Sequence, residues 1–121
     1  MDNIAETTFT FMKSSGEKTD VTITIGAPYK NDDSIWSCSA QMDGLYPPLH
    51  HIMSDDSFHS LCLGISFIHK LCNSFINNGG RILFQGTDGD VPLDEAYFSI
   101  PNSKKTFANQ SIEPIVTTPV D

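Results

Sequence analysis

The alternation of hydrophobic and polar positions in the first third of the chain predicts β-strands. Within residues 20–25, Val21, Ile23 and Ile25 share one side of an extended chain and two threonines take the other side. Residues 35–42 alternate in the same way, and residues 9–12 are rich in β-prone side chains. Short polar segments separate these three runs, so we expect them to pair as an antiparallel meander.

A helical period replaces the alternation after Asp56. Apolar residues then recur every three or four positions from Ser57 to about Asn77, which predicts one long amphipathic helix. Asp55 and Asp56 favour a helix start, and the Asn-Asn-Gly-Gly run at 77–80 favours a helix end. We expect residues 45–53, with two consecutive prolines, to be an irregular connection.

The expected fold class is α+β: an antiparallel β-meander of three to four strands packed against one long amphipathic helix. Residues 81–84 supply the short fourth strand. We expect residues 1–98 to form a single α+β domain. Residues 99–121 are polar and contain several prolines, so we expect a loosely ordered C-terminal tail.

Projection of the helix at about 100° per residue separates its apolar residues into two groups. We expect the larger group, the main stripe, to face the sheet. Its members are Phe58, Leu61, Cys62, Ile65, Ile68, Cys72, Phe75 and Ile76. The smaller group, Leu63, Phe67 and Leu71, lies on nearly the opposite side and forms a second apolar row.

This second row has two interpretations. Either another layer covers it, namely the C-terminal tail or residues 45–53, or it contacts a second copy or a partner protein. On the second interpretation, Leu63, Phe67 and Leu71 are the candidate partner-binding residues. Acidic side chains such as Asp32, Asp33 and Asp43 would then steer a basic partner.

Composition narrows the choice of compartment and partner. The chain has a net charge of -8 and only seven Lys and Arg residues, which argues against nucleic acid as a partner. Three cysteines do not suggest a disulfide framework, and the N-terminus lacks the pattern of a signal peptide. No apolar run is long enough for a membrane span, so we expect a cytoplasmic protein without membrane contact.

The repeated pairs His59/Cys62 and His69/Cys72 suggest a zinc site at first sight. Ten residues of helix separate the two pairs by about 15 Å, however, which is too far for one metal ion. Their positions on the main stripe predict that Cys62 and Cys72 are ordinary buried cysteines. His69 is expected to be partly buried, with a hydrogen-bonded ring nitrogen.

A second group of metal-capable side chains surrounds the expected helix start. It comprises His50, His51, Asp55, Asp56 and His59. Helix capping explains the aspartates and a solvated loop explains the histidines, so we expect no metal and no cofactor. Cys38 lies on the apolar face of its strand and is expected to serve packing, so the sequence predicts no catalytic residue.

Several short motifs resemble those of small bacterial proteins that share a domain of unknown function. They are an Ile-Gly-Ala-Pro turn at 25–28, Trp36-Ser37-Cys38, Gly44, an Asp-Ser step into a helix at 56–61, and a Gly-Gly strand at 79–84. The resemblance spans roughly residues 21–92, departing at Ser54 and Phe84. It implies the fold and a bacterial cytosolic origin, and it implies no catalytic residue.

These observations predict a non-enzymatic protein-binding module, of an immunity or regulatory type, that acts on a protein partner or as a homodimer. The alternative is a metal-dependent or small-molecule-binding protein that uses the cluster of His50, His51, Asp55, Asp56 and His59.

Overall fold

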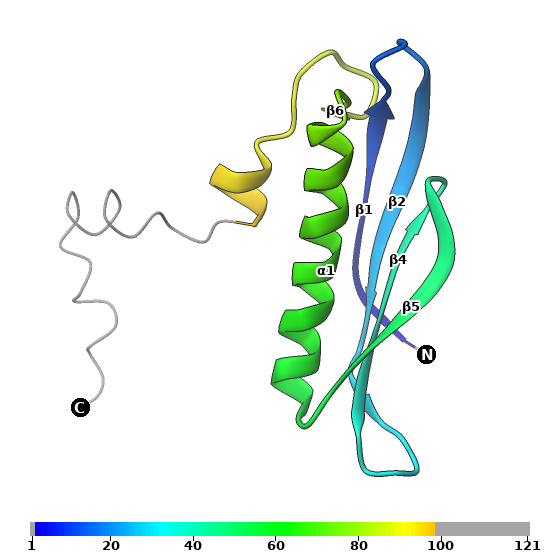
Figure 1. Cartoon of the computed structure of the whole chain (residues 1–121), viewed down its shortest axis with the longest axis vertical. Coiled ribbons are helices and arrows are strands. Elements are labelled where there is room, and N and C mark those ends of the chain that lie inside the picture. The colour runs from blue at the N-terminus through cyan, green and yellow to red at the C-terminus, as the bar shows by residue number, and fades with distance from the viewer. Residues whose placement is uncertain (1, 99–121) are drawn as a thin grey trace, which may run out of the picture. The chain divides into compact units, whose positions relative to one another are not determined.

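The structure, a computed structural model, describes residues 2–98, except for the side chains of Pro47 and Pro48 (Figure 1). The chain divides into two compact units, Met1–Val91 and Pro92–Asp121. In the second unit, the described part forms one π-helical turn, η1 (Leu93–Tyr97). The expected tail at 99–121 lies outside the described residues. Among residues 2–98, no helix is long and apolar enough to cross a membrane.

The first unit is an antiparallel sheet with one main helix, which confirms the α+β class. Within the described residues the sheet has six strands, two more than the upper limit expected from the sequence. The strands are β1 (Asn3–Met12), β2 (Lys18–Gly26), β3 (Tyr29–Lys30), β4 (Trp36–Asp43), β5 (Tyr46–Ser54) and β6 (Arg81–Phe84). Helix α1 (Ser57–Asn77) connects β5 to β6 and has the bounds that the sequence predicts.

Strand β4 pairs with three other strands, β2, β3 and β5. Ala40 pairs with Ile25 of β2 and with His50 of β5, so β2 and β5 lie on opposite edges of β4. Trp36 pairs with β3 and with β5, which places β3 on the same edge of β4 as β2. Among the strands of residues 2–98, β5 is therefore an edge strand, and β6 forms the other edge beside β1.

The expectation of an irregular connection at residues 45–53 was wrong. Residues 46–54 form β5, which pairs with β4 from Trp36 to Met42. A tight turn at Gly44, whose φ of 111° suits glycine, reverses the direction of the chain between β4 and β5. Proline is tolerated here because an edge strand has one unpaired side, and the register shifts between Ala40 and Met42 near the two prolines.

Helix α1 lies along one face of the sheet (Figure 1). That face is built from alternating apolar residues that the sequence identified. Trp36 is half-buried, and the buried ones are Phe9, Phe11, Val21, Ile23, Ile25, Cys38, Ala40 and Met42. The helix buries Ser60, Gly64, Ile68 and Cys72, a row spaced every four residues. Three of these four side chains are small, so the helix backbone approaches the sheet closely.

The assignment of the main stripe to the core was therefore only partly correct. Ile68 and Cys72 are buried and Phe75 is half-buried, but Phe58 is 75% exposed and Ile65 is 41% exposed. The helix is rotated about its axis so that the small residues, and not the bulkiest stripe, meet the sheet. Hydrophobicity alone did not reveal this, because a serine and a glycine define the buried row.

Candidate functional site

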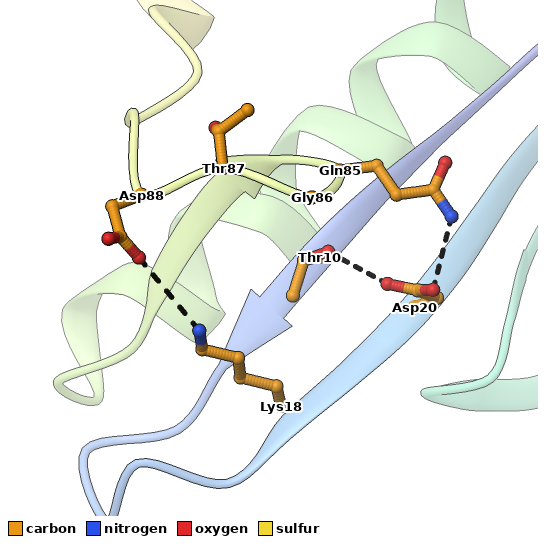
Figure 2. A pocket seen from close by; sticks show the side chains of 7 residues that line it. All are labelled: Thr10, Lys18, Asp20, Gln85, Gly86, Thr87 and Asp88. Carbon is orange, nitrogen blue, oxygen red and sulfur yellow. Dashed lines mark hydrogen bonds and ion pairs between the residues drawn. The ribbon is translucent and has the colours of Figure 1, made fainter.

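An open polar groove of about 580 Å³ lies over β1, β2 and the turn that follows β6 (Figure 2). Its walls are formed by Thr10, Lys18, Asp20, Gln85, Gly86, Thr87 and Asp88. Thr10 and Asp20 point away from the face that α1 covers, because their sequence neighbours Phe9, Phe11 and Val21 point into the core. The groove therefore belongs to the polar face of the sheet.

The carboxylate of Asp20 is held in place by two side chains of the groove. It accepts hydrogen bonds from Thr10 Oγ1 at 2.7 Å and from Gln85 Nε2 at 3.1 Å. Figure 2 shows the Asp20 side chain between these two donors. The hydrogen bond from Thr10, and then that from Gln85, lowers the pKa of Asp20, so this residue is charged at neutral pH.

Lys18 and Asp88 form an ion pair across the other end of the groove, with 3.9 Å between Nζ and Oδ1. Asp88 is 94% exposed, so solvent screens the pair and it adds little to stability. The walls contain no histidine or cysteine, and Thr10 is the residue there whose hydroxyl donates to the Asp20 carboxylate. The groove can bind a small polar group, but it is open and mostly exposed.

The loop beside the groove is held by a second carboxylate. Arg81 donates from Nε and Nη2 to the two carboxylate oxygens of Asp90 at 3.0 and 3.2 Å, and from Nη2 to the Asp88 backbone carbonyl at 3.1 Å. The hydrogen bond from Arg81 lowers the pKa of Asp90. These contacts fix the turn at 85–89, from which Gln85 reaches Asp20.

The histidine and aspartate cluster at the start of the helix is divided by β5. His50 points to the helix side, where its ring lies 4.6 Å from that of Phe67, whereas His51 Nδ1 lies 3.3 Å from the Tyr29 hydroxyl on the other face. Asp56 caps the helix by accepting a 2.7 Å hydrogen bond from the His59 backbone N–H. Among residues 2–98, no three His, Cys, Asp or Glu side chains are placed to share a metal ion.

The cysteines occupy two kinds of environment. Cys38 and Cys72 are buried as expected, and burial raises the pKa of the Cys72 thiol to about 12. The expectation that Cys62 is buried was wrong, since it is exposed on the outer side of α1. His69 is half-buried with its Nε2 3.1 Å from Asn73 Nδ2, which confirms the expected hydrogen-bonded ring nitrogen.

The candidate partner-binding residues Leu63, Phe67 and Leu71 are all half-buried. The Phe67 ring packs on His50 of β5, the segment that the sequence offered as one possible cover of this row. A role of the row in partner binding stays a prediction, but its exposed area is smaller than the sequence implied.

A different apolar surface lies on the outer side of α1. Its residues follow spacings of four, three, four, three and four, which is the heptad pattern of helices that pack against another helix. We call it the α1 seam, and it comprises Phe58, Cys62, Ile65, His69, Cys72 and Ile76. Four of its residues are exposed, namely Phe58, Cys62, Ile65 and Ile76. His69 is half-buried, and Cys72 is buried in the core.

The α1 seam contains no Asp, Glu, Lys or Arg. The whole helix contains no Asp or Glu, although the chain has fifteen of them, and Lys70 is its one Lys or Arg. The residues that border the seam on its solvent side are His59, Ser66 and Asn73. A neutral apolar strip on an otherwise acidic protein is typical of a contact surface.

The sequence gives the spacing of the α1 seam residues, but it does not show that they are exposed. Every member of the α1 seam, His69 included, had been assigned to the core side of the helix by its place along the main stripe. The four-residue spacing of Ser60 and Gly64 with Ile68 was the available signal, because small residues mark the side on which a helix approaches its neighbour. The groove could not be anticipated, since Gln85 and Asp20 meet only through the pairing of β6, β1 and β2.

Comparison with known proteins gives a family but no activity. The family model of a domain of unknown function, DUF6968, matches residues 5–94. No match was found among curated proteins or among solved structures.

Proposed function

Since the chain belongs to the DUF6968 family, a domain of unknown function, we propose on the structure alone that it is a non-enzymatic protein-binding module. We further propose that the α1 seam is its binding surface. The observation that carries this proposal is the exposure of Phe58, a large aromatic residue that is 75% accessible at one end of a neutral apolar strip.

The energetic argument is direct. Burial of a side chain such as Phe58 or Ile65 against a partner contributes about 1.5–3 kcal/mol, and aromatic residues are common anchors of protein interfaces. Solvent exposure of several such residues on one helix has no benefit for the isolated domain. The alternating spacing of the α1 seam suits a helical partner, because a heptad strip keeps contact along a second helix.

The polar groove is a weaker candidate. Its carboxylate already accepts two hydrogen bonds within the protein, and its lysine is paired. A ligand would have to compete with these internal contacts in an open, solvated site. Binding pockets for small molecules are usually enclosed and mostly apolar, which this groove is not.

A photocrosslinker placed at Phe58, in cells of the organism that produces the protein, tests the proposal. Glu6 on β1 is the control position, because it is exposed and far along the sequence from the helix. We expect a defined protein adduct from position 58, none from position 6, and loss of the adduct when Ile65→Asp is added. Equal labelling from both positions, or no adduct from position 58, would overturn the proposal.

A further inference from the structure

Strand β5 lies at one edge of the sheet and leaves one side of its backbone unpaired (Figure 1). Among the strands of residues 2–98 it pairs with β4 alone, so every second residue of β5 points its backbone N–H and C=O away from the sheet. Such groups pair readily with a further extended chain. A helical partner cannot satisfy them, because its own backbone groups are already bonded to one another.

The two halves of β5 differ in how this edge is protected. Pro47 and Pro48 lack a backbone N–H, and the register with β4 shifts beside them. Prolines and register shifts are devices that block the addition of a strand. Residues 49–54 have neither device, because they pair with β4 in unbroken register and include no Pro, Gly or charged Lys, Arg, Asp or Glu. We call residues 49–54 the β5 edge.

One flank of α1 faces the β5 edge. Gly64 lies against Cys38 of β4. Phe67, one turn further along the helix, packs on His50 of the neighbouring β5. The flank that carries Phe67 and Leu63 is therefore turned toward the free side of β5. Both side chains are half-buried, so they keep apolar surface for an added strand.

Apolar side chains also flank the edge on the opposite face of the sheet. Leu49 and Met53 point there, because both lie an odd number of positions from His50, which faces α1. Leu49 is 41% exposed and Met53 is 59% exposed. An added strand alternates its side chains between the two faces, and both faces offer apolar contacts. A segment that is apolar in its centre therefore suits this edge.

Carboxylates gather at one end of the β5 edge. The start of β4 lies level with the end of β5, so the segments that precede β4 and follow β5 meet at the same end of the sheet. Asp32 and Asp33 precede β4, Asp55 and Asp56 follow β5, and all four are exposed. Lys30 is the single Lys or Arg from position 19 to position 69. This end of the edge therefore attracts positive charge.

We propose that the β5 edge binds an extended segment of another protein, which adds a strand to the sheet. The segment is apolar in its centre and carries Lys or Arg at the end that lies level with Ser54. A second copy of this chain does not match, because both copies carry a net charge of -8. The β5 edge is separate from the α1 seam, and its role does not rest on the function proposed for the seam.

The first experiment uses a displayed library of random peptides, selected for binding to the purified full-length chain. We expect the selected peptides to share an apolar centre with Lys or Arg toward one end. Phe58→Ala, in the α1 seam, should leave their affinity unchanged, so the result is independent of the proposed function. Failure to enrich any peptide, or enrichment of peptides without basic residues, would contradict the proposal.

Backbone methylation of the tightest selected peptide tests the mode of binding. An added strand directs only every second backbone N–H toward β5. Two forms of the peptide, N-methylated at alternate positions in the two possible phases, keep the same side chains. Because each lost hydrogen bond costs about 1 kcal/mol, one form should bind about a hundredfold more weakly than the other. Equal affinities of the two forms would show that the peptide does not bind as a strand and would overturn the proposal.

Hydrogen exchange locates the bound peptide. Binding should slow the exchange of those amides in residues 49–54 that point away from β4, and should leave the amides of β1 unchanged. Slower exchange confined to α1 or to the polar groove would place the peptide elsewhere and overturn the proposal. If every amide of residues 49–54 already exchanges slowly in the free protein, residues 99–121 or a second copy occupy the edge, and the proposal is wrong.

A matched pair of variants tests the basic end of the segment. Asp55→Asn should weaken binding by about two- to fivefold, and added salt should reduce this difference. Glu17→Gln makes the same change in net charge just before β2, beyond the end of the sheet where Thr22 pairs with Asp43, and should leave the affinity unchanged. Equal effects of the two variants would contradict the proposed placement of the basic end.

Discussion

Gly64 of α1 and Cys38 of β4 face each other so closely that a Cβ atom on Gly64 would lie 3.0 Å from the Cys38 Sγ. The Cys38 thiol donates to the Gly26 carbonyl oxygen at 3.3 Å, which limits its freedom to move aside. The helix therefore lies close to β4 at Gly64, with the buried row of Ser60, Gly64, Ile68 and Cys72 turned toward the sheet.

Gly64→Ala should therefore destabilise the domain despite the better helix propensity of alanine. The propensity gain of about 1 kcal/mol is opposed by overpacking of about 1–3 kcal/mol. We expect a net loss of about 1 kcal/mol in denaturant unfolding. In a Cys38→Ala background the obstruction is gone, so the same substitution should become neutral or stabilising. Additivity of the two substitutions would show that the contact does not limit the packing.

Phe67→Ala and Phe58→Ala should differ clearly in their effects on stability. Phe67 is half-buried with its ring 4.6 Å from that of His50, so its truncation should cost about 2 kcal/mol. Phe58 is 75% exposed, and its truncation should change the free energy of unfolding of the monomer by less than about 0.5 kcal/mol. Both are measured in dilute protein. A larger loss of stability from Phe58→Ala than from Phe67→Ala would instead support the helix orientation that the sequence alone suggests, in which Phe58 faces the sheet.

The three cysteines should react at different rates with a thiol-specific reagent. In dilute native protein, Cys62 should react fast because it is exposed, and Cys62→Ser should remove this phase. Cys72 should stay unreactive at mildly alkaline pH, because its pKa of about 12 leaves little thiolate. Denaturation should expose all three thiols. Fast reaction of Cys72 in the native state would contradict its burial.

Asp20 should make a small pH-dependent contribution to stability. Its pKa is lowered in the folded protein, so its contribution is present above the ordinary value of 3.8 and is lost as the pH falls through the lower folded value. Asp20→Asn should therefore lower the melting temperature relative to the wild type at neutral pH. This difference should shrink in strong acid, and a constant difference would show that hydrogen bonding does not favour the carboxylate. Thr10→Val should give a similar, smaller pattern, because it removes the 2.7 Å hydrogen bond.

The sequence by itself determined the fold class, the bounds of α1, the inward face of β2 and β4, and the burial of Cys38 and Cys72. These features depend on local periods and caps, which neighbouring residues alone impose. The sequence also contained the heptad spacing of the α1 seam, but that spacing was compatible with either a buried or an exposed strip.

Only the tertiary structure decided which strip of α1 is buried. The small residues Ser60 and Gly64 are buried, and Gly64 lies against Cys38 of β4, so the larger side chains of the helix are divided between its flanks and solvent. The same kind of long-range contact made β5 a strand despite its prolines and joined Gln85 to Asp20 across the groove. Local pattern gives each element its apolar side chains, but the distance of closest approach between elements determines which of them remain exposed.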